Sequence, residues 1–180
     1  MKRAFGVACL SLALAACGDS GGADTDGDGV ISNDEARAEV ESDGGQIKPE
    51  PGKYRATMTF VSADIPNAPP EMQSMIGSQM SHSSEICITD EMAERGFEDA
   101  IKESQDDSCT IDKFNIDGND VEMAMSCKDD GAGAMTMSMT GNVTPTRSEM
   151  TMISEGMMAE MGGGTVEMKL VQERIGECDA

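Results

Sequence analysis

The feature that most constrains the fold is a segment that begins and ends with cysteine, Cys109–Cys127 (CTIDKFNIDGNDVEMAMSC). Its centre, Asp117-Gly118-Asn119, is typical of the tight turn of a β-hairpin. Each cysteine lies nine residues from Gly118, so a hairpin would place the two cysteines opposite each other. The segment therefore predicts two antiparallel strands and favours a disulfide between Cys109 and Cys127.

Further segments with alternating apolar side chains extend this hairpin into a sheet. A second hairpin is predicted from Ala134 to Ser154, with Thr144-Pro145-Thr146-Arg147 as its turn. Folding about that turn places Met139 near Met152. Other predicted strands are Lys53–Ile65, Ser83–Thr89 and Thr165–Arg174, and short helices are predicted at Glu71–Met80 and Asp90–Glu103, with Met75 and Met92 among their buried contacts. We expect a mainly β fold, an antiparallel sheet of hairpins with one or two short helices.

The first residues have the layout of a secretory signal peptide. Lys2 and Arg3 precede an apolar run that ends at Ala16 and is too short to span a bilayer. Leu14-Ala15-Ala16-Cys17 resembles the lipobox of bacterial lipoproteins, which implies cleavage after residue 16 and acylation of Cys17. Several acyl chains on one residue would give stable anchoring. Gly18, rather than Asp, after the anchor favours the outer membrane by the same resemblance. The alternative is ordinary secretion with Cys17 as a free thiol.

The exported location bears on the four cysteines of the mature domain, Cys87, Cys109, Cys127 and Cys178. An even number of cysteines in an oxidising compartment predicts two disulfides. Three pairings are open, and the symmetry of the hairpin favours Cys109–Cys127, which leaves Cys87–Cys178. A zinc site is a poor alternative, because the chain has no CxxC spacing and His82 is its one imidazole.

Residues 24–35 (DTDGDGVISNDE) fit the EF-hand calcium loop at each constrained position. Ca²⁺ takes six to eight oxygen ligands, so the chain must curl and present a carboxylate at every second residue. The resemblance implies ligands from Asp24, Asp26, Asp28, the Val30 carbonyl, Ser32 through water, and Glu35. Gly29 allows the sharp turn, and Ile31 stands where EF-hands keep an apolar residue. The alternative is an acidic, solvated linker that matches the pattern by composition.

The sequence predicts half of an EF-hand. Asn33 to Ser42 is predicted to form the helix that leaves the loop, with Ala36 and Val40 on one face. Residues 17–23 are expected to be a flexible tether instead of an incoming helix. An unpaired loop of this kind is expected to bind calcium loosely, at about 10⁻⁴–10⁻³ M. The Gly- and Pro-rich segment 44–52 then marks a boundary, so we expect a signal peptide at 1–16, a lipid-anchored acidic tether at 17–48 and a β-rich domain at 49–180.

Charge and composition exclude several classes of function. The chain carries 34 acidic and 13 basic side chains, a net charge of −21, which argues against nucleic acid or an anionic membrane surface as a partner. A single histidine makes Ser-His or Cys-His catalysis hard to assemble. The sequence also lacks G-x-S-x-G, phosphate-loop and H-E-x-x-H patterns. We therefore expect a non-enzymatic protein.

Methionine is unusually frequent, with 17 residues. Met135, Met137 and Met139 alternate along a predicted strand, which suits the buried face of a sheet, where methionine would replace leucine and aromatic residues. The alternative is a periplasmic protein that binds copper or another soft metal, because thioethers are ligands for Cu(I). A further alternative is a binding module of the cell envelope for a small ligand or a protein, whose partner the sequence does not name.

Several short motifs occur in a set order along the predicted domain. They are Pro51-Gly52-Lys53-Tyr54, Cys87-Ile88-Thr89, Cys109-Thr110 with Phe114, Met125-Ser126-Cys127, Met139-Thr140-Gly141 and Arg174-Ile175-Gly176-Glu177-Cys178. Together they resemble the bacterial exported family named domain of unknown function 3617, over about residues 49–178. The resemblance implies an envelope location and disulfides, and it implies no mechanism. The sequence as a whole predicts a periplasmic calcium-binding lipoprotein.

Overall fold

The computed structural model describes residues 22–42, 47–66, 68–96, 108–129, 133–156 and 163–179. The predicted signal peptide and Cys17 lie outside these residues. Within them the chain forms seven strands and three helices. The helices are α1 (Asn33–Ser42), α2 (Pro70–Met80) and α3 (Asp90–Arg95), and the strands are β1 (Gly52–Asp64), β2 (His82–Ile88), β3 (Cys109–Asp117), β4 (Asp120–Asp129), β5 (Gly133–Thr144), β6 (Arg147–Glu155) and β7 (Thr165–Gly176).

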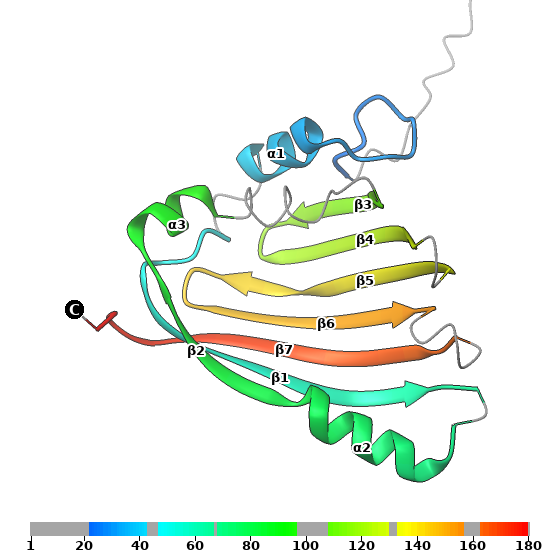
Figure 1. Ribbon diagram of the computed structural model, residues 1–180. Coiled ribbons are helices and arrows are strands. Elements are labelled where there is room, and N and C mark those ends of the chain that lie inside the picture. Colours follow the sequence, from blue (N-terminus) through cyan, green and yellow to red (C-terminus); the bar gives the residue numbers. More distant parts are fainter. Residues whose placement is uncertain are drawn as a thin grey trace, which may run out of the picture.

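All seven strands belong to one antiparallel sheet with the order β2-β1-β7-β6-β5-β4-β3 (Figure 1). From β3 to β7 each strand pairs with the next one along the chain. Strand β1 is different, because it lies between β2 and the last strand, β7. The two edges of the sheet are therefore β2 and β3. The predicted fold class, a mainly β antiparallel sheet with short helices, is confirmed.

Both predicted hairpins are confirmed at their turns. Asp117 pairs with Asp120 around Gly118, whose φ of 62° suits the tight turn. Thr144 pairs with Arg147, and Met139 lies opposite Met152. The predicted cysteine pairs are also present. Cys109 lies opposite Cys127 in the β3–β4 register and is bonded to it, and a second disulfide joins Cys87 and Cys178.

Methionines form a row across the middle of the sheet. Successive cross-strand pairs join four of them on β4, β5, β6 and β7, with a phenylalanine at each end of the row: Phe114, Met123, Met139, Met152, Met168 and Phe60. Residues that lie directly opposite each other on neighbouring strands project from the same face of a sheet. The row therefore lies on a single face.

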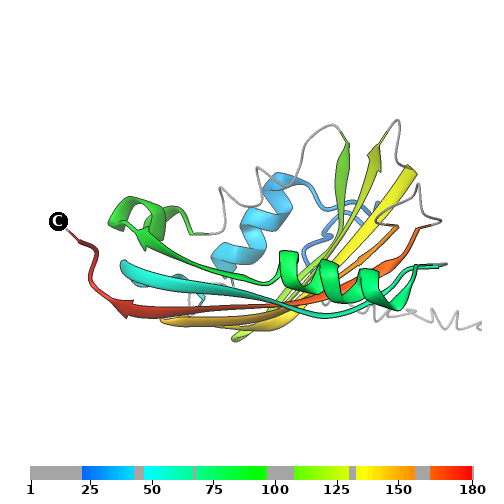
Figure 2. The ribbon, with the colours of Figure 1, turned by 60° about the horizontal axis from the view of Figure 1, so that its bottom comes forward.

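That face carries two clusters of buried apolar side chains, and α1 and α2 lie on the same side of the curved sheet (Figure 2). In the first cluster, residues of α1 and the segments beside it pack on Phe114, Ile116 and Val121, together with partly buried Met123 and Met139. In the second, side chains of α2 pack near Val166, Met168 and partly buried Met152. The methionine face is thus packed as core. Met75 and Met92 were predicted to be buried, which is wrong, because they are 55% and 44% exposed on the outer faces of α2 and α3.

The segment before the sheet differs from the tether that the sequence predicts. Five of its apolar residues are buried in the first cluster: Ala23, Ile31, Ala36, Val40 and Ile47. Helix α1 forms as predicted and buries the expected face through Ala36 and Val40. The physical reason for the difference is that these side chains share one apolar face, which is stabilised by burial against β3 and β4. Residues 22–42 are therefore part of the folded domain.

Candidate metal centre

Three of the predicted calcium ligands converge. One carboxylate oxygen from each of Asp24, Asp26 and Asp28 lies within 4.8 Å of the others. Asp24 is half-buried, and the other two aspartates are exposed. Three like charges at this spacing repel each other in water, and a divalent cation placed among them would remove the repulsion.

The backbone of the loop curls around the first aspartate. Asp24 accepts hydrogen bonds from the N–H groups of Gly27, at 2.7 Å, and Gly29, at 3.1 Å. Both glycines have φ values of about 80°, a left-handed conformation that glycine adopts without strain. Asp28 accepts from the N–H of Val30, at 2.8 Å. The loop thus has the tight curvature that a carboxylate at every second position requires.

Glu35 joins the two ends of the loop. Its Oε1 accepts from the N–H of Thr25, at 2.9 Å, and from the Thr25 hydroxyl, at 2.8 Å. Its Oε2 accepts from the N–H of Ser32, at 3.0 Å, and from the Ser32 hydroxyl, at 2.8 Å. These bonds, led by the one from the Ser32 N–H, lower the pKa of Glu35 from its ordinary 4.5 to about 2. Glu35 is not among the three clustered carboxylates.

Ser32 and Glu35 also form a capping box at the start of α1. Ser32 accepts from the N–H of Glu35, at 3.3 Å, while the Glu35 carboxylate accepts from the N–H of Ser32. Ser32 is therefore a helix cap as well as a predicted ligand. Val30, which is predicted to contribute its carbonyl, has an exposed side chain. The sequence did not single out Thr25, although its hydroxyl holds the carboxylate that closes the loop.

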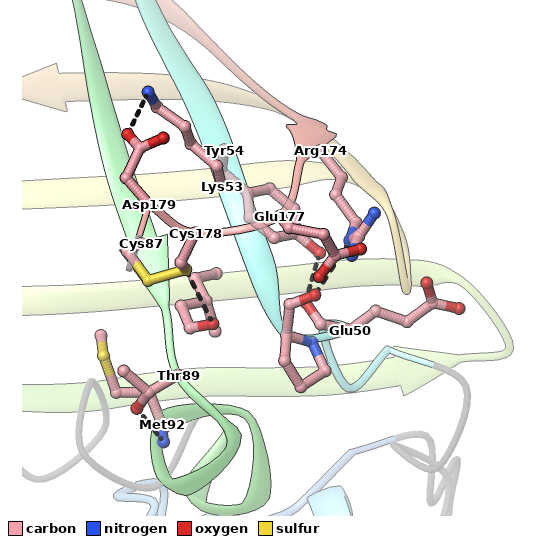
Figure 3. The surroundings of a disulfide bond; sticks show 12 residues. Glu50, Lys53, Tyr54, Cys87, Thr89, Met92, Arg174, Glu177, Cys178 and Asp179 are labelled. Atoms are coloured by element: carbon pink, nitrogen blue, oxygen red, sulfur yellow. Dashed lines mark hydrogen bonds and ion pairs between the residues drawn. A yellow bond between two sulfur atoms is a disulfide. The ribbon is translucent and has the colours of Figure 1, made fainter.

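A second group of charged and polar residues surrounds the Cys87–Cys178 disulfide (Figure 3). Arg174 donates from Nε to the Pro51 carbonyl, at 2.9 Å, and pairs with Glu177, at 2.6 Å. Lys53 contacts Asp179, at 3.0 Å, and also Glu85; these bonds raise the pKa of Lys53. The disulfide and these contacts fasten the C-terminal end of the chain to β1 and β2.

Tyr54 belongs to the same corner. Its hydroxyl lies 2.8 Å from the Glu50 carbonyl oxygen and 2.7 Å from that of Pro145, so its one proton can be donated to either of these carbonyls. The N–H of Glu50 also donates to Pro145, at 2.7 Å. Burial raises the pKa of Tyr54. The tyrosine thus connects the start of β1 to the turn between β5 and β6.

Three of the six motifs quoted for the family resemblance meet at this corner, because Pro51-Gly52, Cys87 and Arg174–Cys178 contact one another there. A search of protein families agrees: the chain matches the family described as protein of unknown function (DUF3617) over residues 49–178. The chain belongs to the DUF3617 family. No curated protein and no solved structure matches it significantly.

The acidic loop and the corner around Cys87–Cys178 differ in their position relative to the matched range. The corner around Cys87–Cys178 lies inside the DUF3617 domain, and the loop at 24–35 precedes the matched range. The loop is nevertheless packed against that domain through Ala23, Ile31 and α1. Among the helices of the described residues, none has the length and apolar character needed to cross a membrane.

The DUF3617 sheet also carries a polar hollow of about 730 Å³ formed by β3 to β6. Its lining includes Asp117, Asp120, Glu122, Arg147 and Glu149. Two of these carboxylates are paired, Glu122 with Lys113 and Glu149 with Lys169 and Arg147. The hollow is open, and two of its four carboxylates are paired with basic side chains of the protein, so it does not single out a ligand.

Proposed function

We propose that this member of the DUF3617 family is a calcium-binding lipoprotein of the cell envelope without enzymatic activity. The observation that carries the proposal is the convergence of Asp24, Asp26 and Asp28 on a loop that is already curled. In this proposal the Val30 carbonyl, Ser32 through water, and Glu35 complete the oxygen ligands.

Glu35 would have to exchange bonds to take part. An ionised carboxylate has about four sites for accepting hydrogen bonds. All four are used by Thr25 and Ser32, two bonds on each oxygen. Bidentate binding of Ca²⁺ would therefore replace some of these bonds, and this cost adds to the lack of a second loop as a reason for weak affinity. We expect a dissociation constant of about 10⁻⁴–10⁻³ M.

Calorimetric titration of the full mature chain with calcium tests the site. Asp24→Ala and Glu35→Ala should each abolish the binding heat. Asp34→Ala is the matched control, because Asp34 lies in the same acidic stretch but is 92% exposed and pairs with Arg37, at 3.5 Å. It should bind calcium like the unaltered chain. Absence of binding at millimolar calcium would refute the proposal.

The anchor is a separate part of the proposal. It rests on the lipobox-like Leu14-Ala15-Ala16-Cys17 and places the protein at the periplasmic face of a membrane, with the outer membrane favoured. Metabolic labelling with a fatty-acid analogue should mark the unaltered protein and leave Cys17→Ser unlabelled. Equal labelling of both proteins, or of neither, contradicts lipidation at Cys17.

Cu(I) binding is a second candidate, and the methionine row across β4 to β7 is the observation that favours it. The same side chains pack in the two core clusters, so binding copper there would require them to leave the core. We therefore expect no Cu(I) uptake in a competition titration with a chromogenic chelator. Stoichiometric uptake that Met139→Leu and Met152→Leu together remove would instead support the copper function.

A further inference from the structure

Strand β3 is an edge of the sheet, and one side of its backbone has no neighbouring strand. Exposed edges of this kind invite pairing with other chains, and proteins cover them. Here the N-terminal segment does so. The Ala23 N–H donates to the Phe114 carbonyl, at 2.9 Å, and the Ile31 N–H donates to the Ile111 carbonyl, at 2.8 Å. Ile31 and Ile111 also form an isolated antiparallel bridge.

Helix α1 covers the next part of the same edge. The Ile116 N–H donates to Oε1 of Glu39, at 3.0 Å, so a side chain of α1 takes the place of a neighbouring strand. Ala36 is fully buried and Val40 is 6% exposed in the same cluster as Ile116. The apolar contacts and this hydrogen bond hold α1 in one position on β3.

The contacts with the edge lie on both sides of the acidic loop and inside it. Ala23 directly precedes Asp24, Ile31 is within the loop, and Glu39 follows Glu35 by one helical turn. The path of the chain between Ala23 and Ile31 is therefore fixed at both ends by β3. A change in the shape of the loop must strain these contacts or release them.

We propose that residues 22–42, the edge cap, cover β3 in a cation-dependent way. The proposal rests on the proposed calcium site and adds what that site controls. In the absence of a cation, repulsion among Asp24, Asp26 and Asp28 opposes the curled loop, so the edge cap opens more often. A cation that binds the curled loop better than the open one shifts the population towards the covered edge. The calcium site would thus control how often strand β3 of the same molecule is covered.

Amide hydrogen exchange at Ile116 in the full mature chain measures the opening, because this N–H is bonded to Glu39 and not to a strand. At free calcium of about ten times the dissociation constant, the opening equilibrium should fall about tenfold, and exchange should slow by the same factor. Amides of β1 that pair with β7 should change little, since they lie far across the sheet from β3. Calcium binding detected by calorimetry without slower exchange at Ile116 overturns the proposal and leaves the calcium site standing.

Two variants test the edge cap without calcium. Glu39→Ala and Glu41→Ala each remove one carboxylate from α1, but Glu39 accepts from β3 whereas Glu41 is exposed. In calcium-free buffer, exchange at neighbouring β3 amides should accelerate in Glu39→Ala and stay unchanged in Glu41→Ala. Equal rates in both variants overturn the edge cap itself. Absence of calcium binding in the calorimeter overturns both the proposed function and the cation dependence, whatever the variants show.

Discussion

Gly52 and Arg174 lie so close together that a side chain at position 52 has no room. A Cβ there would stand 2.5 Å from Nε of Arg174 and 2.7 Å from the carbonyl oxygen of Gly176. The closeness lets Arg174 reach the Pro51 carbonyl. The Pro-Gly pair at the start of the DUF3617 domain and the Arg-to-Cys segment at its end are thus parts of one junction between β1 and β7.

The first prediction concerns this junction. Gly52→Ala should lower the free energy of unfolding by about 1–3 kcal/mol, the usual cost of overpacking. Gly176→Ala is the matched control, because Gly176 has a similar φ, 156° against 147°, but an added Cβ would meet no atom within 4 Å. Urea unfolding measures both variants. A smaller loss in Gly52→Ala than in Gly176→Ala would contradict the steric explanation.

The second prediction compares the two disulfides. Cys87–Cys178 spans 91 residues and Cys109–Cys127 spans 18. In the chain-entropy model a crosslink stabilises by restricting the unfolded chain, by about 4.5 kcal/mol for the longer loop and about 3 kcal/mol for the shorter one. Replacing both members of a pair by serine should therefore be more costly for Cys87–Cys178. Denaturant unfolding of the two double variants provides the comparison, and the reverse order would contradict this account.

The third prediction concerns pH. Tyr54 is the one tyrosine in a chain without tryptophan, so tyrosinate absorbance reports its titration directly. Burial raises its pKa in the folded protein above the ordinary value of 10.0. The neutral hydroxyl is favoured by the fold, so its contribution to stability is complete below the ordinary pKa. It is lost as the pH rises through the raised value. We expect a higher absorbance midpoint in the folded protein than in urea, and equal midpoints would be incompatible with a buried Tyr54.

The fourth prediction concerns the apolar contact of the acidic loop. Ile31 is 2% exposed and its neighbour Val30 is 43% exposed. Ile31→Ala should cost about 2–5 kcal/mol of stability, as a buried large-to-small change does. Val30→Ala, which shortens an adjacent side chain of similar shape, should cost less than about 0.5 kcal/mol. Thermal unfolding without calcium tests the pair. If both variants unfold like the parent, the loop is not packed on the sheet as described.

Local signals explain which parts of the fold could be predicted from the sequence. The turns at Gly118 and Pro145 depend on the residues within them, and the second turn sets the register that brings Met139 to Met152. The register of the first hairpin shifts between Ile111 and Lys113, and this shift brings Cys109 opposite Cys127. The capping box of Ser32 and Glu35 is also local. The carboxylates of the first three aspartates in the calcium-loop pattern lie together in the structure, because the spacing in the pattern is the spacing of the turn itself.

Long-range contacts explain what could not be predicted. Ile31 pairs with Ile111, which is 80 residues away in the sequence, and no local pattern near either residue predicts this contact. The partners in β1 and β7 are still more distant along the chain, as in the pairs Asp64–Thr165 and Lys53–Gly176. The segment before the domain has five scattered apolar residues, so its sequence is typical of a solvated tether. In the structure these residues lie on a common face, which packs against β3. The edge cap was missed for this reason.

The methionine row has a chemical consequence. Thioethers are flexible and polarizable, so they fill the space between Phe60 and Phe114 without the exact shapes that branched side chains need. They are also the apolar side chains that oxidants convert to polar sulfoxides. Met123, Met139 and Met152 are partly accessible, so oxidants can reach the row from its surface. A leucine core of the same volume would be inert, whereas this core couples the redox conditions around the protein to the integrity of its packing.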